Sequence, residues 1–191
     1  ASGLKNGHTL FYTQKTAVSI ADGYKEFYEK ATESGSGYKC VLVPNYYDFK
    51  TPLNAVAADH DNERRFIKEL ISSDNVPHID AWIKSTPMGF YEIEYYWKKR
   101  EHPKRGKFNP DFFIKKNNLI LVVEIKDDED IKEPSIENKK KNGYAMDHFK
   151  RVNIYLRKNK IKTLYQFNFL TPSDFGRYFQ SIRTGDITNF R

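Results

Sequence analysis

The sequence predicts an α/β fold in which helices flank one mixed β-sheet. An amphipathic helix is followed by four apolar segments of strand length, and then by a long helix, a fifth such segment and a last helix. The third and fourth segments flank Asn117-Asn118, and asparagine tolerates the positive φ that a two-residue hairpin turn requires. Aromatic residues form 15% of the 191 residues, which excludes a disordered polyelectrolyte.

Residues 1–60 form the first part of the expected organisation. Apolar residues recur at helical spacing over residues 14–31, the run Ser34 to Gly37 interrupts this pattern, and residues 38–44 resemble a strand. The chain begins with Ala1 rather than Met. We therefore interpret residues 1–60 as a helix, a connection and a strand that form the junction to a preceding domain.

Residues 61–191 are expected to form the main domain. Asp61 or Asn62 can cap its first helix, which carries an apolar stripe and ends before Pro77. An acidic run, residues 127–130, is expected to be a mobile, solvated loop. The expected strands are residues 79–83, 90–97, 112–114, 119–125 and 163–170, and the expected later helices are residues 134–159 and 173–182.

The hairpin around Asn117-Asn118 brings charged side chains together. If these two asparagines form the turn, counting outward places Asp111 directly opposite Glu124, with Cβ atoms about 5 Å apart. Lys126 shares the face of Glu124 because side chains alternate along a strand. Two carboxylates this close repel unless a cation intervenes, and Mg²⁺ favours carboxylate oxygens, waters and phosphate oxygens. With a lysine to position water, this trio suits the hydrolysis of phosphodiesters.

The motif Pro110-Asp111, twelve residues, then Glu124-Ile125-Lys126 resembles the signature of the PD-(D/E)XK nuclease superfamily. The resemblance implies a restriction-endonuclease-like core: a central mixed sheet flanked by helices, over roughly residues 61–170. It also implies that Asp111 and Glu124 bind Mg²⁺, for which Mn²⁺ would substitute, and that Lys126 is the catalytic lysine. Many members carry an acid on the preceding helix, where Glu63 stands. Alternatively, Glu63 only complements the helix dipole.

Further segments resemble the C-terminal nuclease of type III restriction subunits and related helicase-nucleases. The segments are Glu63-Arg64-Arg65-Phe66 with Leu70, Trp82-Ile83-Lys84, and Phe90-Tyr91 with Tyr95. This likeness implies a cytoplasmic DNA endonuclease of restriction or antiviral defence, joined to a helicase or translocase. The chain contains no GxxxxGK[ST] loop, so such a motor would lie on a preceding domain or another subunit.

Basic residues lie on either side of the motif. The chain carries 32 Lys and Arg against 25 Asp and Glu, a net charge of +7, which suggests an anionic partner. One group fills the expected loop entering the Asp111 strand, and the other opens the long helix. Both could bind phosphates or simply be solvated. The candidate nucleic-acid-binding residues are Lys98, Lys99, Arg100, Lys104, Arg105, Lys107, Lys140 and Tyr144.

Other classes of protein are disfavoured. Cys40 is the single cysteine, so an internal disulfide and a cysteine-based zinc site are excluded. No apolar run reaches the length of a membrane span, and no long basic amphipathic helix carries exposed aromatic residues, so no membrane partner is expected.

A non-catalytic nucleic-acid-binding or assembly module that retains the nuclease fold is the alternative to an enzyme. Cutting both strands of DNA requires two sites, which would suit a homodimer. Glu92 and Glu94 share one face of the 90–97 strand and are expected to be solvated rather than catalytic.

Overall fold

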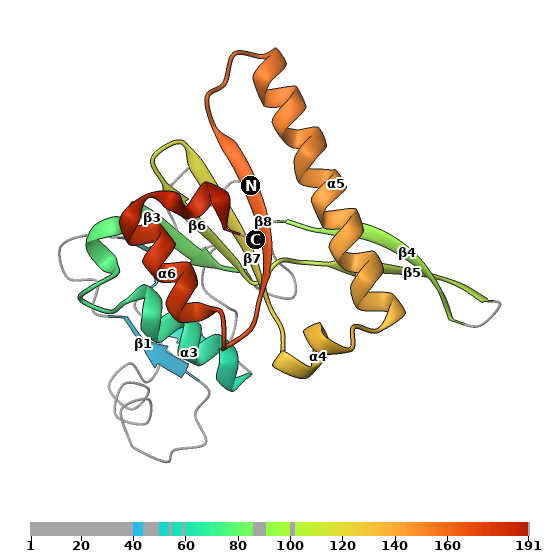
Figure 1. Cartoon of the computed structure of the whole chain (residues 1–191), viewed down its shortest axis with the longest axis horizontal. Coiled ribbons are helices and arrows are strands. Elements are labelled where there is room, and N and C mark those ends of the chain that lie inside the picture. The colour runs from blue at the N-terminus through green and yellow to red at the C-terminus, as the bar shows by residue number, and fades with distance from the viewer. Residues whose placement is uncertain are drawn as a thin grey trace, which may run out of the picture.

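A four-stranded mixed sheet forms the centre of the fold (Figure 1). The computed structural model describes residues 40–43, 50–53, 55–58, 60–85, 91–99 and 102–190. Its central strands, in spatial order, are β3 (Ala81–Lys84), β6 (Phe112–Lys116), β7 (Leu119–Ile125) and β8 (Leu164–Leu170). The first two pairings are antiparallel and the last is parallel. The predicted fold class, a mixed sheet flanked by helices, is confirmed. The helix expected over residues 14–31 and its Ser34–Gly37 connection lie outside the described residues.

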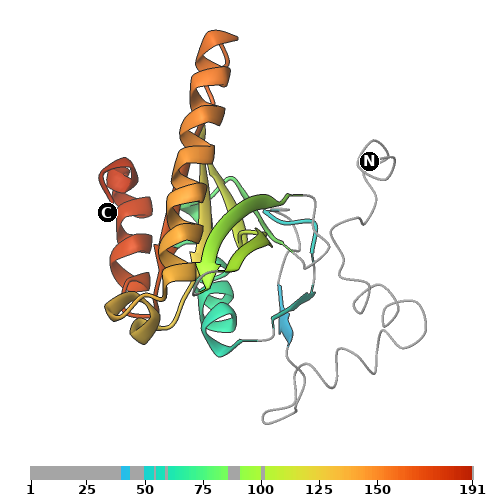
Figure 2. The ribbon, with the colours of Figure 1, turned by 90° about the vertical axis from the view of Figure 1, so that its right-hand side faces the viewer.

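Helices cover both faces of this sheet because side chains along each strand point alternately to its two faces, and both faces carry apolar residues. Phe112 and Ile114 of β6 pack in one core with α3 (Asp61–Leu70) and α6 (Phe175–Thr184). Phe113 points the other way, into a second core with Phe149 of α5 (Ile136–Lys158). Ser135 caps α5 by accepting a hydrogen bond from the Asn138 backbone N–H at 3.0 Å. Figure 2 shows that the C-terminal end of α5 extends beyond the sheet.

The β6–β7 hairpin has the register predicted from its sequence. Lys116 pairs with Leu119, and the ladder continues to Phe112 opposite Val123. Asn117 takes a positive φ of 53°, and its backbone N–H donates to an Asp80 carboxylate oxygen at 2.6 Å. The turn therefore fixes which residues face each other at the far end of the hairpin, where the motif lies.

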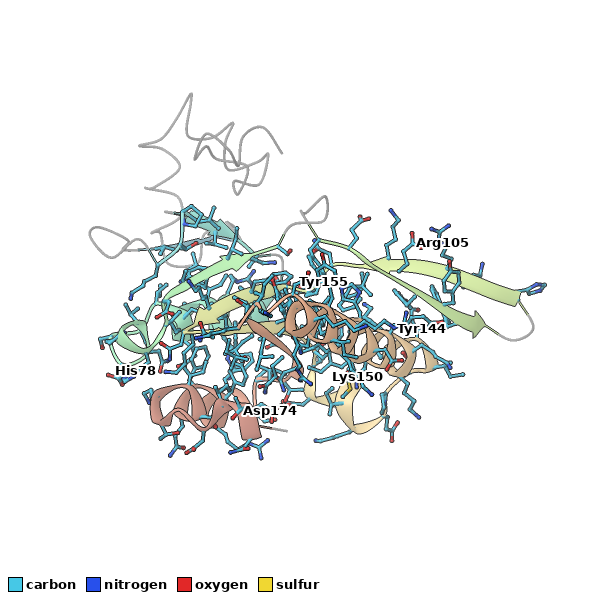
Figure 3. The ribbon with its side chains drawn as sticks, turned by 90° about the horizontal axis from the view of Figure 1, so that it is seen from above. His78, Arg105, Tyr144, Lys150, Tyr155 and Asp174 are labelled. Atoms are coloured by element: carbon cyan, nitrogen blue, oxygen red, sulfur yellow. The ribbon has the colours of Figure 1, made fainter. Side chains whose placement is uncertain are left out.

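A second hairpin replaces the basic loop expected before Asp111. Strand β4 (Ile93–Lys99) pairs with β5 (His102–Phe108) along its whole length. The β5 sequence contains Pro103 and Gly106 between basic residues, so it lacks the apolar alternation that marks a strand. Backbone pairing with β4 therefore stabilises β5 as a strand, although the β5 sequence alone does not favour one. The hairpin lies beside the N-terminal half of α5 and projects past it (Figures 1 and 3).

Gly106 accommodates two aromatic rings of the opposite strand. Tyr95 and Trp97 stack with ring centroids 5.0 Å apart, and a Cβ built on Gly106 would lie 2.7 Å from the Tyr95 ring. Gly106→Ala is therefore expected to lower the free energy of unfolding by about 1–3 kcal/mol. Gly176→Ala is the control, because no described atom lies within 4 Å of its Cβ and alanine favours helix α6. Urea denaturation of both variants measures this; equal stabilities would contradict the packing.

The acidic run also differs from the expected mobile loop. Residues Asp128–Lys132 form the short helix α4, which hydrogen bonds hold to its neighbours. Ser173 Oγ donates to Asp128 at 2.7 Å, and the Asn62 amide donates to Asp127 at 2.6 Å. These carboxylates accept hydrogen bonds from side chains distant in the sequence. Such partners cannot be identified from the composition of the acidic run.

Short elements complete the described chain. Strands β1 (Cys40–Leu42) and β2 (Ala55–Ala57) pair with each other, and Val41 and Val56 join the same core as α3. Single turns of 3₁₀ helix occupy Val76–His78 and Asp186–Asn189. None of the helices within the described ranges combines the length and apolarity needed to cross a bilayer.

Candidate active site

Asp111, Glu124 and Lys126 lie together at one end of the β6–β7 hairpin. Phe112 pairs with Val123, and Asp111 and Glu124 are the next residues outward on the two chains. The charge of Glu124 acts on the Asp111 carboxyl, so the two side chains lie near each other. The Ile125 backbone N–H donates to Asp111 Oδ2 at 2.7 Å, and Lys126 Nζ donates to Glu124 Oε1 at 2.7 Å. The structure therefore brings the three motif residues close together, with Lys126 hydrogen-bonded to Glu124 and Asp111 interacting electrostatically with both.

Glu63 approaches the cluster from α3. Its carboxylate forms an ion pair with Lys84 Nζ at 3.2 Å, and these side chains are 11% and 12% exposed. The Ser85 backbone N–H donates to the Asp111 carbonyl at 2.8 Å, which fixes the end of β3 beside the motif. Glu63 thus lies near the predicted site, paired with a lysine that sequence reasoning did not assign to it.

Burial and neighbouring charges alter the Asp111 carboxyl. Burial raises the pKa of Asp111 to about 8, and the negative charge of Glu124 is the next largest cause. Glu63 also raises this pKa, whereas Lys84 and the Ile125 N–H lower it. The opposed carboxylates therefore bind a proton strongly when no cation lies between them.

Stability is expected to depend on pH through Asp111. Its pKa rises from 3.8 to about 8 on folding, so the folded protein holds this proton more tightly than the unfolded chain. The resulting contribution to the free energy of unfolding is complete below pH ~4 and is lost as pH rises through ~8. In EDTA, the free energy of unfolding should fall by a few kcal/mol, in order of magnitude, between about pH 5 and pH 8.5. Asp111→Asn should flatten this decline and Asp186→Asn, at an exposed position, should preserve it. Urea denaturation across this range measures the slopes; identical slopes in all three proteins would contradict the prediction.

Glu124 is the most buried carboxylate of the cluster. Its side chain is 6% exposed, and Oε1 contacts both Lys126 and, at 3.6 Å, Lys141 Nζ. Its other oxygen, Oε2, is buried and has no hydrogen-bond partner among the residues that the structure describes. A buried carboxylate oxygen without a donor is energetically costly, so this atom is a natural ligand for a cation or water.

Lys141 is the second cluster residue that sequence reasoning missed. The sequence favoured Lys140, but Lys141 is the residue in phase with Ala145 and Phe149, which form the buried stripe of α5. Its ammonium lies over the rings of Phe108 and Tyr95, 5.3 and 5.8 Å from their centroids. Counting back four residues from Ala145 along the buried face of α5 leads to Lys141.

The donor set fits Mg²⁺. Two opposed carboxylates provide the hard oxygen ligands that Mg²⁺ takes from a protein, with water and phosphate oxygens completing its shell. Within the described ranges, no group of three or more His, Cys, Asp or Glu is arranged to hold a metal. The fit therefore rests on Asp111 and on Glu124 Oε2, which has no partner among the described residues, since Lys84 engages Glu63.

The candidate nucleic-acid-binding residues that the structure describes lie on the β4–β5 hairpin and on α5. Of the hairpin residues, Arg105 forms an ion pair with Glu94, and Lys107 contacts Glu92 at 2.8 Å. Glu92 and Glu94 are thus exposed, as expected, but paired. Lys98 and Lys99 occupy the end of β4, Lys104 is exposed on β5, and Arg100 lies outside the described residues.

Lys140 and Tyr144 lie elsewhere, on the exposed side of α5. Both line a groove of about 550 Å³ between α5 and the first residues of β4. The basic residues of this groove therefore all lie on α5, while its other side carries Glu92, Ile93 and Glu94.

Comparisons with models of protein families, with curated proteins and with solved structures found no match for this chain. The cluster contains three carboxyl groups, of Asp111, Glu124 and Glu63, and three ammonium groups, of Lys84, Lys126 and Lys141. Such an arrangement can hold a cation between carboxylates and still present positive charge to a phosphate.

Proposed function

We propose that this chain is a metal-dependent endonuclease that hydrolyses DNA phosphodiester bonds. The observation that carries the proposal is the closeness of the Asp111 and Glu124 carboxylates beside Lys126, with Glu124 Oε2 buried and unpartnered among the described residues. This geometry agrees with what the resemblance to PD-(D/E)XK nucleases implies.

Each residue of the cluster has a role in the proposed reaction. Asp111 and Glu124 would hold Mg²⁺ or Mn²⁺, which supplies an activated water and stabilises negative charge on the phosphate. Lys126 Nζ, 2.7 Å from Glu124 Oε1, orients the attacking water and offsets charge that develops in the transition state. The Lys84–Glu63 pair adjusts the proton affinity of Asp111, since Lys84 lowers its pKa and Glu63 raises it.

The wider setting follows from the likeness to type III restriction nucleases. We infer a cytoplasmic role in restriction or antiviral defence, in which a helicase or translocase delivers the DNA. The net charge of +7 and the basic residues of the hairpin and α5 support a nucleic-acid partner. Cleavage of both strands would use two copies of the chain.

One observation favours the alternative of a non-catalytic binding module. Lys126 and Lys141 both contact Glu124 Oε1, so the carboxylate is already neutralised by the protein's own cations. In such a module the cluster would stabilise the fold, and the basic surfaces would bind nucleic acid without cutting it.

Plasmid cleavage separates the two functions. Supercoiled plasmid is incubated with the 191-residue chain in Mg²⁺, Mn²⁺ or EDTA, and nicked and linear products are resolved on a gel. The endonuclease predicts nicking with either metal and none in EDTA. Nicking that persists in EDTA, or that Asp111→Asn leaves undiminished, would contradict it.

A further inference from the structure

The groove between α5 and β4 is large enough for more than a phosphate. Its volume of about 550 Å³ lies within the usual range of sites that bind small organic molecules. Its walls are α5 from Lys139 to Arg151 and the segment Glu92 to Glu94 at the start of β4. Figure 3 shows Tyr144 on α5 next to this hairpin, with Tyr155 further along the same helix.

Charges of both signs line this groove. Lys139, Lys140 and Arg151 stand on α5, and none of them forms an ion pair within the described part of the chain. Asp147 adds a carboxylate from the same helix. The other two carboxylates of the groove, Glu92 and Glu94, are already paired with Lys107 and Arg105. A nucleotide suits the remaining charges, since its phosphate binds cations while the amino and imino groups of its base can donate to Asp147.

Two exposed tyrosines add a surface for stacking. Tyr144 lines the groove and is 38% exposed, and Tyr96 on β4 is 48% exposed. Their ring centroids are 6.3 Å apart with planes tilted by 52°, so the rings do not stack on each other. Exposed aromatic rings beside basic groups are what proteins use to bind unpaired bases.

The groove adjoins the carboxylate cluster through shared elements. Lys140 lines the groove, and the adjacent Lys141 contacts Glu124 at 3.6 Å. On β4, Tyr96 meets Tyr144 while the adjacent Tyr95 packs under the Lys141 ammonium. The same two elements, α5 and β4, therefore carry both the groove and residues that contact the carboxylate cluster, on different faces.

We infer that this groove binds an unpaired nucleotide of the DNA substrate, with Tyr144 and Tyr96 stacking on its base. The inference rests on the proposed endonuclease function and names its substrate class. The preferred DNA carries a single-stranded end or branch rather than an uninterrupted duplex.

Tyr144 provides the test. Fluorescence anisotropy in EDTA measures binding of the whole chain to a labelled single-stranded oligonucleotide and to a duplex of the same length. Tyr144→Ala should weaken single-strand binding by about 5- to 100-fold, and duplex binding by less than about twofold. Tyr144→Phe should restore single-strand binding because it keeps the ring. Tyr155→Ala is the matched control: this tyrosine of α5 is 65% exposed, lies beyond the groove, and should have no effect.

Two outcomes would overturn the inference. One is unchanged single-strand affinity in Tyr144→Ala, and the other is an equal loss of affinity for both DNAs. Plasmid cleavage by the wild-type chain in Mg²⁺ is scored separately. If the wild-type chain cleaves plasmid but either outcome is observed, the groove proposal is wrong and the endonuclease proposal stands. If single-strand binding depends on the Tyr144 ring but no cleavage occurs, the groove proposal stands and the endonuclease proposal is wrong.

Discussion

Replacing Lys126 by alanine is expected to slow Mg²⁺-dependent plasmid cleavage by about 100- to 10,000-fold. The Lys126 ammonium donates to Glu124 Oε1 at 2.7 Å, and its side chain is only 16% exposed. Its loss removes the group proposed to position water, and it leaves the buried Glu124 charge with one ammonium group fewer beside it. Initial rates of nicking at saturating DNA measure the effect, with circular dichroism confirming that the variant is folded.

Lys115→Ala is the matched control for this experiment. Lys115 lies on β6, near the opposite end of the hairpin from Asp111, and its side chain is exposed. Its replacement should change cleavage by less than about threefold. If Lys126→Ala and Lys115→Ala cleaved at similar rates, Lys126 would have no catalytic role.

The second large effect concerns metal binding by Glu124. At about pH 8.5 and an Mg²⁺ concentration of about 100 times its Kd, the ion should raise the free energy of unfolding by about 2.7 kcal/mol. Glu124→Gln should abolish this gain, because an amide removes the buried charge that the ion would neutralise. Thermal unfolding in a series of Mg²⁺ concentrations against EDTA measures the difference.

Glu129→Gln serves as its control, since Glu129 is an exposed acid of α4. This variant should retain the full stabilisation by Mg²⁺. A Glu124→Gln protein that Mg²⁺ stabilises as much as the wild type would show that the ion binds elsewhere.

Much of the sheet could be predicted from sequence because local signals decide it. Asn117 and Asn118 fix a two-residue turn, and the turn fixes the register up to Phe112 opposite Val123, the pair beside Asp111 and Glu124. The apolar stripe from Phe66 to Leu70 identifies α3. These features depend on neighbours in sequence, where periodicity and turn chemistry are informative.

The rest depends on contacts between distant segments. Strand β5 exists because β4 pairs with it, although its own residues suggest a loop. Lys84 joins Glu63 only through the packing of β3 against α3, which no local pattern encodes. The choice between Lys140 and Lys141 is a matter of helical phase, since adjacent residues on a helix point about 100° apart.

The central claim is that Asp111 and Glu124 hold a catalytic metal ion. The most direct measurement is the anomalous scattering of Mn²⁺ soaked into crystals of the chain. We predict a Mn²⁺ peak in contact with carboxylate oxygens of both residues, with Lys126 beside it. A site without manganese, in which the ammonium groups of Lys126 and Lys141 remain on Glu124, would contradict the claim.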